Sequence, residues 1–137
     1  MYQTIMVPVD LAHVERLDKA LKTAADLAKH YGASVCYVGV STAQPGAVAH
    51  TPREFAEKLE QFGKEEAQKR DVQATTKAVM SHDPSIDLDD TLMKAVKETC
   101  ADLVVMASHT PGLPEHIFAS NAGYMASHAD VSVFVVR

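Results

Sequence analysis

Hydrophobic positions along the chain switch repeatedly between short continuous runs and a spacing of three or four residues. The continuous runs predict buried strands, and the wider spacing predicts helices with one apolar face. Strands are expected at residues 4–9, 34–40, 73–80, 103–106 and 131–136, and helices at 13–31, 52–70, 87–100 and 121–128. Because a helix separates each strand from the next, the strands are expected to be parallel.

This alternation predicts an α/β fold with a doubly wound, five-stranded parallel sheet and helices on both faces. Strands buried on both faces read as continuous hydrophobic runs, so the three most apolar strands, 4–9, 34–40 and 103–106, are expected at the centre. The expected strand order is 3-2-1-4-5. We find no internal repeat, and we expect residues 1–137 to form a single domain.

Two helix ends carry explicit signals. Thr51 and Glu54 form a capping box around Pro52 at the first helical position, which predicts a helix start there. Gly32 follows the first predicted helix, where a left-handed C-terminal cap is expected. Residues 42–50 contain small side chains, a proline and a glycine, and predict a loop. The sequence leaves open whether this loop folds over a ligand.

Composition narrows the class of protein. The 137 residues are 47% hydrophobic and carry 13 Lys and Arg against 18 Asp and Glu, a net charge of −5. This acidic balance argues against a broad nucleic-acid surface but leaves room for a small phosphate site. No apolar run is long enough to span a membrane, and the N-terminal residues do not resemble a secretion signal. Cys36 and Cys100 fit neither a disulfide framework nor a zinc site. We expect a cytoplasmic protein.

Candidate chemistry lies at the carboxyl ends of the strands, where open α/β sheets bind ligands. Asp10 follows the first strand, and residues 107–110 follow the fourth. Asp10 either accepts hydrogen bonds from a ribose or binds a cation, or it caps the helix that follows. Ser120 and Asn121 precede the last helix, so one of these side chains caps that helix, or its first N–H groups hold a phosphate.

The sequence lacks the usual signs of a catalytic or metal site. It contains no Gly-x-Ser-x-Gly elbow, no Walker-type phosphate loop and no Gly-x-Gly-x-x-Gly turn. Its seven histidines include no helical i, i+4 pair, and a metal site built from Asp10, His109 and His116 is the less favoured interpretation. We expect no catalytic residue and no metal site. Slow ATP hydrolysis is a minor alternative.

Four segments resemble small single-domain universal stress proteins. They are TIMVPVD at 4–10, VCYVGV at 35–40, ADLVVMASH at 101–109 and SNAGYMASHADVSVFVVR at 120–137. The resemblance covers essentially the whole chain, and it implies the five-stranded α/β fold expected above. It also implies a homodimer that pairs through the last strand, residues 131–136, which agrees with the need to cover an apolar edge strand.

Members of this family that bind ATP generally carry Gly-x2-Gly-x9-Gly-Ser/Thr after the fourth strand. Here Ala107, Thr110 and Ala119 stand at the three glycine positions, and the loop is one residue shorter. A branch with Ala-Ser-His-x-Pro and Ser-Asn-Ala at these places resembles the chain closely, and nucleotide binding is not lost throughout that branch. An alanine forced to positive φ at Ala119 costs about 1 kcal/mol, roughly fivefold in affinity, which weakens binding without abolishing it.

Carried over position by position, the resemblance assigns nine residues to an adenine nucleotide. The three residues at the end of the first strand would approach the ribose and adenine, and the backbone of Val40 would contact the adenine. The two residues at the end of the fourth strand would line the pocket, and the last three residues would face the phosphates. They are Pro8, Val9, Asp10, Val40, Met106, Ala107, Thr110, Ser120 and Asn121.

The expected function is that of a stress-response module. We expect it to bind ATP or another adenine nucleotide weakly, with or without Mg²⁺. The alternative is a ligand-free homodimer that acts through protein contacts. No nucleic-acid or membrane partner is expected.

Overall fold

The computed structural model describes residues 1–108 and 121–137. Its five strands form one parallel sheet in the order β3-β2-β1-β4-β5, which confirms the predicted fold and strand order. In chain order the elements are β1 (Thr4–Val9), η1 (Leu11–Arg16, a 3₁₀ helix), α1 (Asp18–Tyr31), β2 (Ser34–Ser41), α2 (Pro52–Arg70), β3 (Ala74–Met80), α3 (Pro84–Glu98), β4 (Leu103–Ala107), α4 (Ala122–His128) and β5 (Ser132–Val136).

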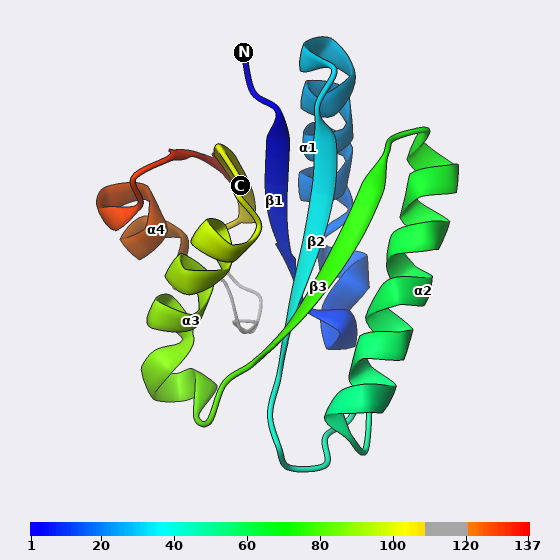
Figure 1. Cartoon of the computed structure of the whole chain (residues 1–137), viewed down its shortest axis with the longest axis vertical. Coiled ribbons are helices and arrows are strands. Elements are labelled where there is room, and N and C mark those ends of the chain that lie inside the picture. Colours follow the sequence, from blue (N-terminus) through cyan, green and yellow to red (C-terminus); the bar gives the residue numbers. More distant parts are fainter. Residues whose placement is uncertain (109–120) are drawn as a thin grey trace.

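Helices cover both faces of the sheet, with α1 and α2 on one side and α3 and α4 on the other (Figure 1). Successive strand residues point to opposite faces, so each central strand contributes to two cores. In β1, Val7 and Val9 pack against α1 and α2, whereas Met6 packs against α3 and α4. This alternation decides which layer a residue at the end of a strand will face.

The two predicted helix ends form largely as expected. The Thr51 side chain accepts a hydrogen bond from the Glu54 N–H at 3.1 Å, and Pro52 begins α2. The Glu54 carboxylate turns back to accept from the N–H of His50 at 3.1 Å, one residue earlier than in a standard capping box. Gly32 ends α1 with φ 67° and ψ 32°, the left-handed conformation that glycine adopts at little cost.

Two helix starts differ from the prediction. The helix expected from residue 13 begins only at Asp18, and η1 precedes it as a separate 3₁₀ segment. That segment is itself interrupted at His13, whose φ of −137° and ψ of 44° lie outside the helical region. The helix expected from residue 87 begins at Pro84, where the Asp83 carbonyl accepts from the N–H groups of Ile86 and Asp87, both at 2.9 Å. Both differences lie at the edges of elements whose type was predicted correctly.

Arg70 ties the C-terminal end of α2 to α1. Its Nε donates to Glu66 Oε2 at 2.6 Å, and its Nη2 donates to Asp18 Oδ1 at 2.9 Å. The Glu66 and Arg70 side chains are largely buried, so the pair is shielded from water. The hydrogen bond from the Arg70 guanidinium lowers the pKa of Asp18. The two helices on this face are therefore fastened to each other beyond their apolar contacts.

Candidate functional site

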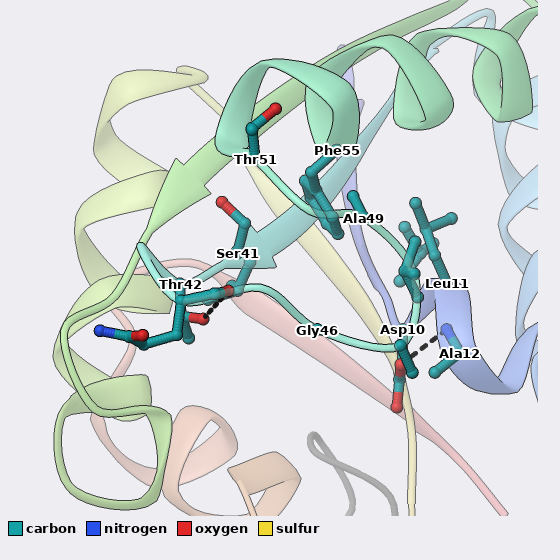
Figure 2. Close-up of a pocket in the computed structure, with 14 residues that line it drawn as sticks. Asp10, Leu11, Ala12, Ser41, Thr42, Gly46, Ala49, Thr51 and Phe55 are labelled. Atoms are coloured by element: carbon teal, nitrogen blue, oxygen red, sulfur yellow. Dashed lines mark hydrogen bonds between the residues drawn. The ribbon is translucent and has the colours of Figure 1, made fainter.

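A cavity of about 170 Å³ lies at the carboxyl ends of β1 and β2, between η1, the first turn of α2 and the loop 42–50 (Figure 2). We call it the Asp10 cavity. Three of the residues expected to bind a nucleotide, Val9, Asp10 and Val40, line it. Its other described lining residues are Leu11, Ala12, Ser41, Thr42, Gln44, Gly46, Ala47, Val48, Ala49, Thr51 and Phe55. The lining thus combines apolar side chains with a few polar groups, as ligand sites commonly do.

Asp10 caps η1. Its Oδ1 accepts a hydrogen bond from the Ala12 N–H at 3.0 Å, and its Oδ2 lies 2.9 Å from His13 Nδ1. The Asp10 side chain is only 12% exposed. The capping role considered from the sequence is therefore realised. A carboxylate has about four lone-pair positions, so two partners do not exhaust its capacity to accept.

The loop 42–50 forms a wall of the Asp10 cavity, which the sequence left undecided (Figure 2). Within the loop, the Thr42 hydroxyl donates to the Gln44 carbonyl at 3.2 Å, and the Gly46 N–H donates to the Ala49 carbonyl at 2.9 Å. The Lys58 ammonium group, from the second turn of α2, donates to the Val48 carbonyl. The sequence predicted a loop here, but its position against Asp10 depends on these contacts.

Phe55 contributes an aromatic ring to the cavity from the first turns of α2, and Gly39 of β2 permits its position. A Cβ atom at residue 39 would lie 2.9 Å from both Cε1 and Cζ of Phe55. Carbon atoms normally approach no closer than about 3.5 Å, so only glycine allows the ring to rest against the strand. Phe55 is buried in the core and also lines the cavity, and nothing in the local sequence marks it as a cavity residue.

Glu54 stabilises the junction between the loop and α2. The hydrogen bond from the His50 N–H lowers the pKa of Glu54, and the Lys58 ammonium group acts in the same direction. Lys58 Nζ lies 3.3 Å from Glu54 Oε1. Glu54 therefore favours its charged form, beside the cavity but outside its lining.

Among the remaining expected site residues, those that the structure describes do not line the Asp10 cavity. Pro8 is buried within β1, and Met106 is buried against α3 and α4. Ala107 lines a different cavity, at the ends of β4 and β5. Asn121 immediately precedes α4, and its side chain makes no capping hydrogen bond. Thr110 and Ser120 lie outside the described residues.

Within residues 1–108 and 121–137, no group of three or more His, Cys, Asp or Glu side chains is arranged to hold a metal ion. Of the three residues considered for a metal site, His109 and His116 lie outside these ranges. Both cysteines are free, with Cys36 buried and Cys100 exposed. No helix in the described part of the chain combines the length and apolar character needed to cross a membrane.

Comparisons with known proteins agree with this fold. The Universal stress protein family matches residues 1–137. Universal stress protein G of Escherichia coli O157:H7 is 30% identical over 148 aligned residues, which cover 100% of both chains. A universal stress protein structure from Archaeoglobus fulgidus aligns with a TM-score of 0.71 and 20% identity over 100% of each chain. Another from that organism, in complex with dAMP, gives 0.69 and 19%, covering 99% of this chain and 98% of the other.

Proposed function

Because this chain belongs to the universal stress protein family, we propose that it is a stress-response module that binds an adenine nucleotide at the carboxyl ends of its central strands. The observation that carries the proposal is the Asp10 cavity, which brings a largely buried carboxylate together with apolar side chains. The dAMP complex of a structural neighbour supports the same ligand class. The proposal assigns no reaction to the protein.

The chemistry of the cavity suits a nucleoside. The ring of Phe55 and the side chains of Val9 and Val40 offer apolar surface to a flat base, and Asp10 retains lone pairs for ribose hydroxyl groups. The volume of about 170 Å³ is below the roughly 300–1,000 Å³ of complete ligand sites. The cavity therefore accommodates the base and part of the ribose, and the phosphates would lie outside it.

The phosphate contacts are the weaker part of the proposed site. We assign them to Thr110, Ser120 and Asn121, with or without Mg²⁺. We also propose that Pro8 approaches the ribose and adenine, and that Met106 and Ala107 line the nucleotide site beyond the Asp10 cavity. None of the three family glycines is present, so backbone approach to a phosphate is restricted. We therefore propose that ATP and AMP bind with reduced affinity.

The experiment is a thermal-unfolding titration with ATP, ADP, AMP and adenosine. A ligand at one hundred times its Kd stabilises a protein by about 2.7 kcal/mol, which is a Tm increase of roughly 10 °C for a domain of this size. Asp10→Ala removes both the cap and the ribose acceptor and should abolish most of the shift. Asp10→Asn keeps a capping side chain but loses the charge, so it should retain the fold and still show a smaller shift.

Absence of a shift for all four ligands in the wild-type protein would contradict the proposed function. A wild-type shift that persists undiminished in both Asp10 variants would instead contradict the role of Asp10 alone. The two failures are thus distinguishable.

A homodimer that acts through protein contacts is the second candidate, favoured by β5. This strand lies at the edge of the sheet, and its Phe134 side chain is 45% exposed. An apolar side chain on an open edge strand is typical of a surface covered by another chain. We also propose that residues 1–137 act as one domain, and that the two free cysteines reflect a reducing, cytoplasmic environment.

A further inference from the structure

A second cavity, of about 150 Å³, lies at the carboxyl ends of β4 and β5, beside the start of α1. We call it the Arg16 cavity. Its described lining residues are Arg16, Lys19, Ala20, Ala107, Ser108, Val136 and Arg137. A cavity volume of about 10–15 Å³ is enough to hold one water molecule, so this cavity has room for a group of several atoms.

The Arg16 cavity is positively charged in a protein whose net charge is −5. Three of its described lining residues, Arg16, Lys19 and Arg137, carry cationic side chains, and none is acidic. Two acidic residues are close in sequence, the exposed Glu15 beside Arg16 and Asp18 beside Lys19. The Oδ1 of Asp18 accepts a hydrogen bond from Arg70 Nη2 at 2.9 Å. That carboxylate is therefore engaged with α2, and its charge is largely offset there.

The polar side chains among the described lining residues, Arg16, Lys19, Ser108 and Arg137, can all donate hydrogen bonds to an anion. Guanidinium and ammonium groups are the side chains that most often recognise phosphate, because they combine charge with several donors. Ser108 adds a hydroxyl group at the end of β4, where its backbone N–H is already bound to the Val136 carbonyl at 2.7 Å. Lys19 Nζ donates to the backbone oxygen of Arg137 at 2.9 Å, which holds the ammonium group at the cavity rim.

The short helix η1 connects this cavity to the Asp10 cavity. Leu11 and Ala12, at its beginning, line the Asp10 cavity, and Arg16, at its end, lines the second one. Strand order places the two cavities close together, since β1 and β5 are two strand spacings, or about 10 Å, apart across β4.

We propose that the Arg16 cavity binds a phosphate group through Arg16, Lys19 and Arg137. The phosphate has two sources, the phosphate tail of a nucleotide whose base occupies the Asp10 cavity, or a free phosphate anion. In the first case the proposal rests on the proposed function, and cationic side chains would compensate for the missing glycines. In the second it stands independently of nucleotide binding.

The test is calorimetric titration at low ionic strength with adenosine, ATP and inorganic tripolyphosphate. The variant is Arg16→Gln/Lys19→Gln, and the matched control is Lys22→Gln/Lys29→Gln, which removes the same charge from α1 at residues that do not line the cavity. Arg137→Gln is a second, milder variant that keeps the test valid if the double variant unfolds. Circular dichroism verifies the fold of each protein.

If the phosphate belongs to the nucleotide, the cavity variant should bind ATP at least tenfold more weakly while adenosine binding changes less than twofold. If it is a free anion, the wild-type protein should bind tripolyphosphate, and the cavity variant should lose at least tenfold of that affinity. The control variant should differ from wild type by less than twofold throughout.

The proposal is overturned if the cavity variants match the control for both ATP and tripolyphosphate, or if the wild-type protein neither prefers ATP over adenosine nor binds tripolyphosphate. Should the wild-type protein bind no adenosine and no ATP, the proposed function fails, and the tripolyphosphate titration still decides the role of this cavity.

Discussion

Replacing Gly39 with alanine is expected to disturb the Asp10 cavity through Phe55, although residue 39 does not line that cavity. The new Cβ atom would lie 2.9 Å from two atoms of the Phe55 ring and 3.1 Å from Leu59 Cδ2. Carbon atoms pack at about 3.5–4.0 Å, so the ring must move by roughly 0.6 Å or more. Because Phe55 lines the cavity, its displacement alters the surface offered to a base.

The expected loss of stability follows from two opposing effects. Overpacking of a core costs about 1–3 kcal/mol, whereas replacing glycine by alanine within a strand gains about 0.5–1 kcal/mol. We therefore expect Gly39→Ala to lower the free energy of unfolding by about 1 kcal/mol, within a range of about 0–2.5 kcal/mol. We also expect it to weaken adenosine binding, because the ring no longer rests where the base would contact it.

A double-mutant cycle with Phe55→Leu tests this cause directly. Leucine has no counterpart of the ring atoms Cε1 and Cζ, so it removes the closest contacts while remaining apolar. In the Phe55→Leu background, Gly39→Ala should cost less than about 0.5 kcal/mol or be stabilising. The measurement is urea unfolding followed by circular dichroism, with the m-values compared to exclude a change in the unfolded state.

Gly123→Ala in α4 is the matched control, because no atom lies within 4 Å of its added Cβ. It should be neutral or stabilise the protein by up to about 1 kcal/mol through helix propensity. If Gly39→Ala lowers stability equally, within about 0.5 kcal/mol, in the presence of Phe55 and of leucine, the contact with the ring is not the cause, and the reasoning is refuted.

Two further predictions concern the edge of the sheet and the response to pH. If the proposed dimer pairs through β5, Phe134→Lys should convert it to a monomer in sedimentation experiments. Met80→Lys on β3, at the opposite edge of the sheet, should leave the proposed dimer intact. A dimer that survives Phe134→Lys would place the interface elsewhere. Glu54 has a lowered pKa in the folded protein, so its charge stabilises the fold above the ordinary value of 4.5, and this contribution is lost as the pH falls through the folded pKa. Glu54→Gln should therefore lower Tm at pH 7, and this loss should become smaller as the pH is lowered below 4.5. A loss of Tm that does not change with pH would contradict the assignment.

The sheet was predictable because its strands are separated in sequence and differ in burial. β1, β2 and β4 read as continuous apolar runs and lie at the centre, whereas β3 alternates weakly and lies at an edge. Burial on both faces leaves a pattern in the sequence that does not depend on long-range contacts. The same local information is sufficient to assign each helix to a connection between two strands.

Helix starts were less predictable where the backbone competes with the apolar pattern. The spacing of Leu17, Ala20 and Leu21 continues toward residue 13, yet Asp10 caps a separate 3₁₀ helix before α1 begins. The start of α3 did carry a readable signal, since Asp83 followed by Pro84 is the cap-and-proline arrangement that also precedes α2. Its apolar stripe begins only at Leu88, which delayed the predicted start.

The candidate site was predictable only in part. Strand ends indicated Asp10 and residues 107–110, because ligands bind at that edge of the sheet, whereas Val40 came from the family resemblance. The part played by the loop 42–50 depends on the contact of Lys58 with Val48, ten residues away, and local sequence patterns do not encode such a contact. The Arg16 cavity combines residues 16–20 with residues at the ends of β4 and β5 that follow more than 80 positions later, so only the fold brings its charges together.

Arg70 anchors the end of α2 that lies farthest from the Asp10 cavity, about 27 Å along the helix from Pro52. The opposite end and the loop 42–50 are held by a few hydrogen bonds to Lys58, Glu54 and their own backbone. Opening of this loop would therefore leave the contact between α1 and α2 in place. If a nucleotide binds in the Asp10 cavity as proposed, its entry and release would require movement of the loop and not separation of the two helices.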